Sequence, residues 1–244
     1  MEFESFQSLF IKNFECNGLK NLITEENIEK FYHLTHLMLE KNSVMNITAI
    51  KEIEKIIPLH YADCAMIASY IPKNSKVVDI GCGGGFPTLP LSIIRSDILV
   101  TGVDSTDKKV RYVAETAKIL KLDRISTISA RAEELINTPQ MRESFDVVTS
   151  RAVARLNILS ELCIPFIKTG GYFVVMKGAA GHEELEEAKN GIDKLGGRII
   201  CVENKKLFID ENNTENRVII VIEKVFSTPQ QYPRQFGQIK KKPL

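Results

Sequence analysis

The most informative segment of this chain is Val77-Val78-Asp79-Ile80-Gly81-Cys82-Gly83-Gly84-Gly85-Phe86-Pro87. An apolar run typical of a buried strand breaks into four glycines within five residues, and the following residues, 88–95, have the apolar pattern of a helix. Glycine allows positive φ angles and a close approach to a ligand, because it has no Cβ. A second apolar run ends at Asp104, about twenty residues downstream, where an acid can reach ribose hydroxyls. The combination predicts a nucleotide-cofactor site at the carboxyl edge of a parallel sheet.

The glycine loop departs from two common nucleotide-binding patterns. The dinucleotide pattern G-x-G-x-x-G/A needs a small residue where this chain has Phe86, and the loop lacks the Lys-Ser/Thr ending of a P-loop. The remaining pattern, D-x-G-x-G-x-G, suits a cofactor that has adenosine but no phosphate, and S-adenosylmethionine is such a cofactor. We expect Asp79 to meet its amino end and the loop backbone to pass its methionine part. The alternative is a tight turn without a ligand, which rarely needs four glycines.

Composition favours a globular α/β protein. The chain has 244 residues, of which 44% are hydrophobic and 26% charged, and its net charge is +1. The longest apolar runs are of strand length, the N-terminus is acidic where a signal peptide would be basic, and the five cysteines have neither metal nor disulfide spacing. We therefore expect a cytoplasmic protein that binds neither a membrane nor a metal. From Ser227 onward every charged side chain is positive.

Periodicity divides the chain into three parts. Residues 1–73 have helical patterns, with an N-cap at Thr24, a break at 46–48 and helical periodicity that resumes over 51–70, and we treat them as an N-terminal helical extension. From Lys76 strands and helices alternate, which predicts a mostly parallel doubly wound sheet within 74–226. Residues 227–244 form a basic C-terminal tail, which we expect to be mobile.

The expected strands lie at 76–80, 98–104, 125–129, 145–150, 171–177, 198–203 and 217–223, with helices between them such as 108–120 and 183–194. Only a short polar loop, 210–216, separates the last two strands, so they should form an antiparallel hairpin. The predicted fold class is α/β, a Rossmann-like seven-stranded S-adenosylmethionine-dependent methyltransferase fold with an N-terminal helical extension.

Several short motifs occur in order along nearly the whole chain. They are Asn46-Ile47-Thr48, His60-Tyr61-Ala62-Asp63, the 79–87 loop, Asp104-Ser105 with Lys108-Lys109, Ala132-Glu133, Ser150-Arg151-Ala152, Met176-Lys177-Gly178, and Tyr232-Pro233-Arg234 with Lys242-Pro243-Leu244. In this combination the chain resembles the small-subunit ribosomal RNA methyltransferase G family, also called GidB. The resemblance implies N7-methylation of a guanine in the decoding region of 16S rRNA, with S-adenosylmethionine as the methyl donor. The tail departs from the usual Pro-Arg-Lys-Pro-Gly-Thr-Pro and reads Pro-Arg-Gln-Phe-Gly-Gln-Ile over 233–239.

The chemistry of the motifs agrees with a ring-nitrogen target. Enzymes that methylate exocyclic amines carry an Asn/Asp-Pro-Pro-aromatic loop after the fourth strand, whereas here Arg151-Ala152-Val153 follows it. Methylation of a base carbon needs a cysteine nucleophile, and the candidate Cys163 lies among apolar residues typical of a buried helix. Guanine N7 bears a lone pair and no proton, so alignment can replace a general base. We therefore expect no indispensable catalytic acid or base and assign Arg151 to positioning.

The candidate cofactor residues lie at strand ends. Asp104 would bind the ribose, unless it is only a helix cap; Glu133 would read the adenine edge, unless it is a solvated helix acid. Arg151 would hold the cofactor carboxylate or an RNA phosphate, unless it forms a surface ion pair. The full set is Asp79, Gly81, Gly83, Gly85, Phe86, Asp104, Ala132, Glu133 and Arg151.

The candidate RNA contacts are basic. They are Lys108, Lys109, Arg111, Lys177, Arg234 and Lys241. The alternatives are a solvated helix face for the first three, a salt bridge for Lys177, and a solubilising end for the tail. His60 with Asp63 forms either a polar network under the substrate or a satisfied, partly buried histidine. His33 and His36 lie on an apolar helix, where a structural role is expected.

The expected partner is 16S rRNA or a small ribosomal subunit particle, bound by a monomer. Two other functions stay open at this point. The same fold could methylate a small molecule or a protein, or the chain could be a non-enzymatic cofactor-binding module of a regulatory complex. The intact glycine pattern and Asp104 argue against a degenerate site.

Overall fold

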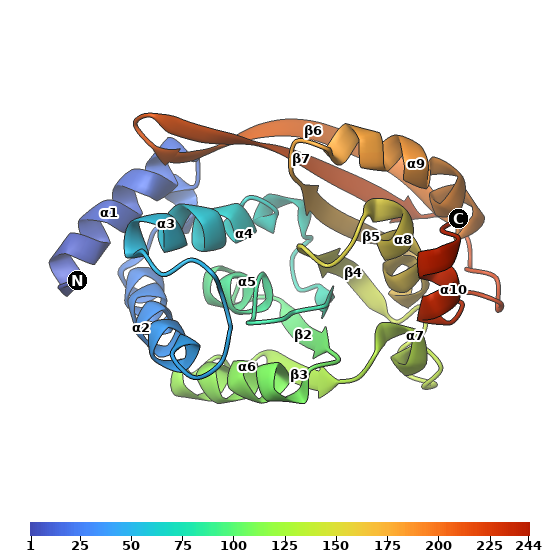
Figure 1. Ribbon diagram of the computed structural model, residues 1–244, viewed down its shortest axis with the longest axis horizontal. Coiled ribbons are helices and arrows are strands. Elements are labelled where there is room, and N and C mark those ends of the chain that lie inside the picture. Colours follow the sequence, from blue (N-terminus) through green and yellow to red (C-terminus); the bar gives the residue numbers. More distant parts are fainter.

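A seven-stranded sheet forms the centre of the molecule in a computed structural model that describes residues 1–244 (Figure 1). Its strand order is β3-β2-β1-β4-β5-β7-β6, with β1 to β5 parallel and β7 antiparallel to both of its neighbours. This is the fold predicted from the sequence, including the terminal hairpin. The strands are β1 (Lys76–Ile80), β2 (Leu99–Asp104), β3 (Ile125–Ser129), β4 (Phe145–Ser150), β5 (Ile167–Lys177), β6 (Gly197–Asp210) and β7 (Asn213–Lys224).

Strand β1 lies at the point where the chain changes direction across the sheet. It pairs in parallel with β2 on one side and with β4 on the other. Between these two neighbours the carboxyl ends of the strands leave a crevice, which is where open α/β sheets bind their ligands. The glycine loop after β1 and Arg151 after β4 therefore meet at one edge of the sheet.

Helices cover both faces of the sheet (Figure 1). The α-helices are α1 (Phe3–Cys16), α2 (Glu25–Asn42), α3 (Ile53–Ile56), α4 (Asp63–Ala65), α5 (Thr88–Ile94), α6 (Asp107–Ile119), α7 (Ala132–Leu135), α8 (Leu156–Cys163), α9 (Gly181–Lys194) and α10 (Phe236–Lys241). Short turns of other helix types are η1 (Lys20–Leu22), η2 (Ile57–Ala62), η3 (Ala68–Tyr70) and η4 (Ile164–Phe166).

Alternate side chains of each strand enter two separate hydrophobic cores. On β4, Val147 belongs to the core shared with α1, α2, α5 and α6, and its neighbour Val148 belongs to the core shared with α8, α9 and α10. All of these helices are therefore anchored directly or indirectly on the sheet. The first core includes most apolar residues of the N-terminal helices, so residues 1–73 and the sheet share one hydrophobic core.

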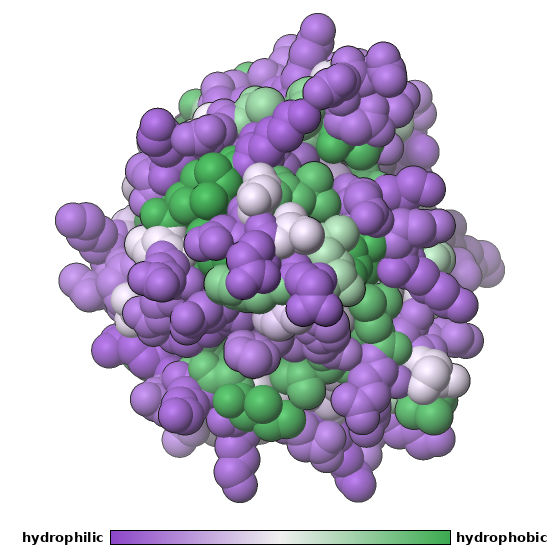
Figure 2. All heavy atoms as spheres, turned by 90° about the vertical axis from the view of Figure 1, so that its left-hand side faces the viewer, coloured by the Kyte–Doolittle hydropathy of each residue, from purple (hydrophilic) through white to green (hydrophobic).

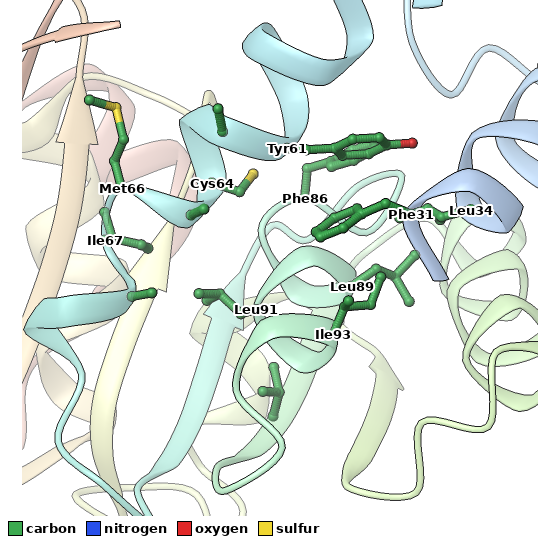
Figure 3. Packing of buried hydrophobic residues seen from close by; sticks show 14 of the residues in the cluster. Phe31, Leu34, Tyr61, Cys64, Met66, Ile67, Phe86, Leu89, Leu91 and Ile93 are labelled. Atoms are coloured by element: carbon green, nitrogen blue, oxygen red, sulfur yellow. The ribbon is translucent and has the colours of Figure 1, made fainter. Parts of the chain in front are cut away.

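The aromatic side chains of the N-terminal helices connect this core to the glycine loop (Figure 3). The ring of Phe31 on α2 lies 4.6 Å from that of Tyr61, and Tyr61 in turn packs 6.4 Å from Phe86 of the loop. The hydroxyls of Tyr61 and Thr35 share a 2.7 Å hydrogen bond, which satisfies both inside the core. The predicted cap of α2 is confirmed, since Thr24 Oγ1 accepts from Asn27 N at 3.1 Å.

The surface of the N-terminal helices is largely polar. Figure 2 shows hydrophilic side chains over most of this face, with hydrophobic ones in separate groups between them. Met1 and Val44 are the exposed large hydrophobic residues within 1–73. The apolar stripes of these helices are therefore directed inward. No helix in the chain is both long and apolar enough to cross a bilayer.

Two stretches differ from the sequence-based predictions, one in helix type and the other in strand length. Residues 51–70 do not form one helix: α3 passes into the π-helical turn η2, and α4 and η3 follow. The terminal hairpin is longer than predicted, because β6 and β7 continue to Asp210 and from Asn213. Its tip reaches α1, where Lys12 and Glu211 form an ion pair of 2.8 Å (Figure 1). This contact with the N-terminal helices supports the extra length.

The structure contradicts the prediction of a mobile C-terminal tail. The guanidinium of Arg142 donates to the carbonyl oxygens of Tyr232 and Thr228, each at 2.9 Å. Further along, Arg234 pairs with the fully buried carboxylate of Glu161, and Ile239 on α10 is fully buried against the second core. The tail carries its own apolar anchors, and its ionic partners lie in distant segments of the chain. Its local composition suggests mobility because these distant partners cannot be seen in the local sequence.

Candidate active site

A cleft of about 540 Å³ opens at the carboxyl ends of β1, β2 and β4. Its volume lies within the usual range for small-molecule sites. Of the residues predicted to bind the cofactor, seven line this cleft: Gly81, Gly83, Phe86, Asp104, Ala132, Glu133 and Arg151. Asp79 and Gly85 lie behind the loop and do not line the cleft.

Glycine is required at different positions of the loop for different structural reasons. Gly83 lines the cleft with a φ of +52°, and a Cβ at this position would meet only the Gly81 carbonyl oxygen, at an ordinary contact distance of 3.9 Å. Gly85 has a φ of +93°, and a Cβ there would lie 2.5 Å from Leu89 Cδ1 of α5. Gly83 thus leaves room for a ligand, whereas Gly85 permits the packing of the following helix. This division separates the cofactor role from the structural role within one motif.

Asp104 ends β2 and faces the glycine loop. Its Oδ2 accepts from Gly83 N at 2.9 Å, and its Oδ1 accepts from Thr106 N at 2.8 Å. A carboxylate has about four acceptor sites, so these two bonds fix its orientation and leave capacity for ligand hydroxyls. The backbone thus orients Asp104 at the position predicted to meet a ribose.

Asp79 is fully buried beneath the loop. Its Oδ2 accepts from Thr88 N at 3.2 Å and from Thr88 Oγ1 at 2.6 Å, which connects β1 to the start of α5. Its Oδ1 has no hydrogen-bond partner. Burial raises the pKa of this carboxyl to about 7, against the lowering effect of the Thr88 hydrogen bonds. An unpaired buried acceptor of this kind fits a site for a cationic group, because a nearby positive charge would stabilise the ionised form of the Asp79 carboxyl.

The far end of the cleft is formed after β3. Ala132 and Glu133 begin α7, and both are largely buried, with Glu133 only 8% exposed. The nearest cationic group to the Glu133 carboxylate is Arg131, at 3.7 Å. The alternative for Glu133, a solvated helix acid, does not hold, since a solvated side chain would be exposed. Its position fits the recognition of a planar polar edge such as that of adenine.

A polar network lies beside the glycine loop and joins three of the sequence motifs. Arg151 Nη1 donates to Asp63 Oδ2 at 2.8 Å and to the Leu59 carbonyl at 3.0 Å, and its Nη2 lies 2.8 Å from His60 Nδ1. Because the guanidinium can only donate, His60 accepts at Nδ1, carries its proton at Nε2 and donates it to Thr48 Oγ1 at 2.7 Å. Arg151 is therefore held in place by the backbone and by two side chains.

The same network forms the floor of a second cleft of about 600 Å³. The two clefts share His60, Arg151, Ala152 and Val153. The second one also contains Arg217 of β7, whose Nε donates to Asp63 Oδ1 at 2.7 Å. Two guanidinium groups thus flank one buried carboxylate. The two clefts are therefore adjacent, and residues of the Arg151 network line both.

His60 is neutral in this network. Its ring stacks on that of Phe86 with a centroid distance of 4.5 Å and an interplanar angle of 16°. Burial, and then the positive charge of Arg151, lower the pKa of His60 to about 3. The Arg151 guanidinium carbon also lies 5.7 Å from the centre of the Phe86 ring. His60 is therefore a fixed hydrogen-bonded wall of the site rather than a titrating group at neutral pH.

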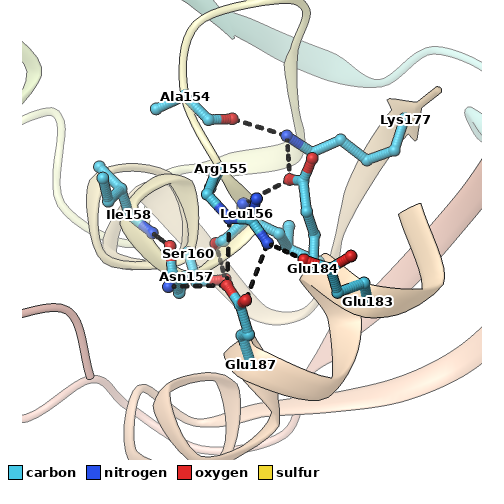
Figure 4. A network of polar contacts seen from close by, with 10 residues as sticks. All are labelled: Ala154, Arg155, Leu156, Asn157, Ile158, Ser160, Lys177, Glu183, Glu184 and Glu187. Atoms are coloured by element: carbon cyan, nitrogen blue, oxygen red, sulfur yellow. Dashed lines mark hydrogen bonds and ion pairs between the residues drawn. The ribbon is translucent and has the colours of Figure 1, made fainter. Parts of the chain in front are cut away.

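The predicted RNA contacts divide into paired and unpaired cations. Lys177 is only 9% exposed, and it donates to Ala154 O at 2.6 Å and pairs with Glu184 at 2.9 Å (Figure 4). Lys177 thus takes the alternative role, an internal salt bridge. Arg234 pairs with Glu161, and Arg111 with Asp107 at 2.8 Å on the same helix. Lys108, Lys109 and Lys241 form no ion pair.

Several residues that line the two clefts were not identified from the sequence. Arg217 on β7 lines the second cleft and Phe236 in the tail lines the first, although both lie far from the motifs in sequence. Ile47 and Val153 also contribute, and a Cβ on Gly81 would lie 2.3 Å from Val153 Cγ2. The Asn46-Ile47-Thr48 motif was a usable signal for Ile47. Arg217 and Phe236 had no local signal, because only the sheet order and the docked tail bring them to the site.

No cysteine at the site has the features of a nucleophile. Cys163 is fully buried in α8, and burial raises the pKa of its thiol. Cys82 lies at the floor of the first cleft with 1% exposure, and burial raises the pKa of its thiol as well. Because the thiolate is the reactive form, both groups are disfavoured for covalent catalysis.

Comparison with known proteins identifies the family. The family model of rRNA small subunit methyltransferase G matches residues 27–209. Proteins named ribosomal RNA small subunit methyltransferase G are 38% identical in Clostridium perfringens (strain SM101), over 94% of this chain and 95% of the relative, and 42% identical in Brevibacillus brevis, over 91% and 93%. The relative in Staphylococcus carnosus is 41% identical over 91% of this chain and 92% of its own length.

Solved structures show the same fold at lower identity. The crystal structure of M. jannaschii TYW2 in complex with AdoMet superposes with a TM-score of 0.53 at 20% identity, over 67% of this chain and 75% of that one. P. horikoshii TYW2 in complex with MeSAdo gives 0.55 at 16% identity, over 68% and 64%. These similarities concern the fold alone. The family model and the near full-length relatives show that this chain belongs to the rRNA small subunit methyltransferase G family, an S-adenosylmethionine-dependent methyltransferase family.

Proposed function

We propose that this protein transfers a methyl group from S-adenosylmethionine to N7 of one guanine in the decoding region of 16S rRNA. Membership of the family supplies the coarser part, methylation of small-subunit rRNA. The observation that carries the finer part is the adjacent pair of clefts, which share a hydrogen-bonded arginine and offer no free base or nucleophile there. Such an arrangement suits an acceptor atom that needs alignment but no deprotonation.

The first cleft fits the methyl donor. The acceptor capacity of Asp104 suits the ribose hydroxyls, the bare backbone of Gly83 suits close passage of the methionine part, and Ala132 with Glu133 suits the adenine. The unpaired Oδ1 of Asp79 suits the amino group, through the electrostatic field of the loop or a bridging water. When bound, S-adenosylmethionine supplies an electrophilic methyl group on a sulfonium.

The second cleft suits the acceptor base. Four cationic side chains (Arg151, Arg155, Lys177 and Arg217) and two carboxylates (Asp63 and Glu184) line it. Guanine presents O6 beside N7 as a hydrogen-bond acceptor, and arginine is the residue that most often recognises this edge. A donor to O6 would turn the N7 lone pair toward the first cleft. Arg151 is the best placed of the four, because it lines both clefts.

Catalysis in this arrangement rests on orientation. His60 is held neutral with its Nδ1 already accepting from Arg151, so it has no role as a base at neutral pH. The Asp63 carboxylate is engaged by Arg151 and Arg217. The chain thus holds Arg151 by several hydrogen bonds beside the largely buried ring of Phe86, and this fixed arrangement acts on the alignment of the two reactants.

RNA phosphates would be bound around the rim of the clefts. Lys108 and Lys109 at the start of α6 and Lys241 in α10 carry unpaired charges, and they supply a salt-dependent and sequence-independent part of the affinity. We further propose that the protein acts as a monomer in the cytoplasm on 16S rRNA or on a small-subunit particle.

Transfer from radiolabelled S-adenosylmethionine to 16S rRNA tests this function. The RNA would be supplied protein-free and as 30S particles from cells that lack this enzyme, and aniline cleavage would map 7-methylguanine. Label at one guanine, reduced at least a hundredfold by Arg151→Met, is expected. Label in neither form of RNA, despite cofactor binding, would overturn the proposal and leave a small molecule or a protein as the acceptor.

A further inference from the structure

The C-terminal segment, residues 227–244, reaches the cofactor cleft. Phe236, the first residue of α10, lines the first cleft together with Ala132 and Leu162. In Figure 1, α10 lies beside α8, against which it packs. The half-buried ring of Phe236 also packs against the second hydrophobic core. An aromatic ring from a tail of this kind is not needed to complete the sheet, which ends at Lys224.

Buried contacts hold Phe236 at this position. Glu161 on α8 is fully buried, and its carboxylate accepts from Arg234 N at 2.8 Å, Arg234 Nε at 2.9 Å and Arg234 Nη2 at 2.6 Å. Three residues after Phe236, Ile239 is fully buried in the second core. The ring is thus held between an ionic anchor and an apolar anchor. A side chain fixed on both sides is preorganised for contact with a ligand.

Upstream contacts fix the beginning of the same segment. Lys224 is buried and donates to the Ile164 carbonyl at 3.0 Å, and it pairs with Glu143 at 3.2 Å. Thr228, also buried, donates from its hydroxyl to Leu195 O at 2.7 Å and accepts at the same hydroxyl from Lys224. The segment is therefore anchored along its length, and Phe236 lies where these contacts bring it.

The location of Phe236 indicates which part of the cofactor it meets. If Asp104 holds the ribose, the adenine extends away from the glycine loop toward Ala132. Ala132 on α7 and Leu162 on α8 belong to the core against which Phe236 packs, and both α7 and α10 contact α8, so Phe236 lines the cleft on the side of Ala132. Purine rings gain affinity from contact with an aromatic side chain. A docked tail therefore closes the adenine end of the site.

We propose that the C-terminal segment is part of the cofactor site: Phe236 contacts the adenine, and the Arg234–Glu161 pair positions it. This proposal rests on the proposed cofactor site. It has a reciprocal consequence, because a ligand that touches the docked tail must stabilise the docked state by the same free energy that docking adds to binding. Cofactor binding and tail docking are thus linked.

Calorimetric titration with S-adenosylhomocysteine, in the absence of RNA, tests the proposal. Phe236→Ala should weaken binding about fivefold to tenfold, whereas Phe236→Tyr should retain it, because the aromatic contact is preserved. Gln238→Ala, an exposed residue of the same helix, is the matched control and should bind like the natural protein. Equal affinity of Phe236→Ala and Gln238→Ala would overturn the proposal. If the natural protein itself failed to bind, the proposed cofactor site would fail instead.

Hydrogen exchange of residues 235–242 provides the second measurement. Saturating S-adenosylhomocysteine should slow exchange of these amides in the natural protein, and the slowing should be much smaller in Phe236→Ala. A tail that exchanges equally with and without ligand, in a protein that binds the ligand, would contradict the linkage. This readout does not depend on methyl transfer and therefore remains informative whatever the acceptor is.

Discussion

The glycine loop and the C-terminal segment line the same cleft, but they are held there by different means. The loop is fixed by neighbours in the local strand–loop–helix unit and by β2: Gly81 N and Cys82 N both donate to Val103 O, and Asp79 ties the loop to Thr88. The tail depends on partners far away in sequence, since Arg234 follows its partner Glu161 by 73 positions. The position of the loop can therefore be predicted from the sequence, whereas the position of the tail depends on contacts that exist only in the folded protein.

The largest effect is expected at the loop. Asp104→Ala removes the acceptor for Gly83 N and the proposed acceptor for the ribose hydroxyls, so the affinity for S-adenosylhomocysteine should fall about a hundredfold, as expected for two hydrogen bonds to a charged group. Calorimetric titration measures this loss. Asp123→Ala, an exposed acid before β3, is the control. An Asp104→Ala protein with natural affinity would place the ribose elsewhere.

At the tail, Arg234→Met should affect stability first. It leaves the Glu161 carboxylate buried without its partner, which should lower the free energy of unfolding by about 3 kcal/mol in urea titrations. The double variant Arg234→Met with Glu161→Met should recover most of this loss, because the unpaired charge is gone. Cofactor affinity should be lowered in the single variant and should not recover in the double variant, since Phe236 has lost its ionic anchor in both. A single variant of unchanged stability would mean that the pair does not hold the tail.

The ionisation of Asp79 provides a pH-dependent test of the loop. Burial raises the pKa of this carboxyl to about 7 in the folded protein, against about 3.9 in the unfolded chain, so it makes stability fall as pH rises from 4 to 7. A cationic ligand group favours the ionised form, and affinity for S-adenosylhomocysteine should therefore drop about tenfold between pH 8 and pH 6. Asp79→Asn should bind more weakly at pH 8 and lose this dependence. Identical pH profiles for the two proteins would show that Asp79 does not sense the ligand.

The smallest effects are expected at the rim. Lys108→Met and Lys241→Met should each weaken RNA binding about twofold to threefold and reduce the salt dependence by about one phosphate contact, without changing cofactor affinity. Filter binding at several salt concentrations measures both quantities. Lys118→Met, near the other end of α6, is the control for Lys108. A change as large as that of Lys108→Met in this control would indicate a general charge effect rather than a defined rim.

The strands and the cofactor edge could be predicted because their signals are local. Apolar runs, a glycine loop and an acid at the end of β2 all lie within a short stretch, and the parallel topology brings their carboxyl ends together. The irregular helix over 51–70 could not be predicted, because η2 is favoured by tertiary contacts of His60 and Tyr61 rather than by helical periodicity. Lys177 is a predicted RNA contact, but in the folded protein it forms an ion pair with Glu184 on the adjacent helix.

Two cleft residues that depend on long-range contacts could not be predicted from the sequence either. Arg217 lies on the antiparallel strand β7 and meets Asp63 only because β7 pairs beside β5. Phe236 follows a Pro- and Gln-rich stretch, whose composition indicates a mobile segment. Only the buried Glu161, which binds Arg234 in this stretch, shows that the segment is docked. In both cases the decisive contact joins segments that are far apart in sequence.

The function proposed for the paired clefts is methylation of one guanine N7 of 16S rRNA. The most direct measurement is mass spectrometry of 16S rRNA fragments from cells without this gene, and from the same cells complemented with the natural protein or with Asp104→Ala. We predict that one 7-methylguanosine in the decoding region disappears with the gene, returns with the natural protein and stays absent with Asp104→Ala. An unchanged inventory of 7-methylguanosine in all these cells would contradict this proposal.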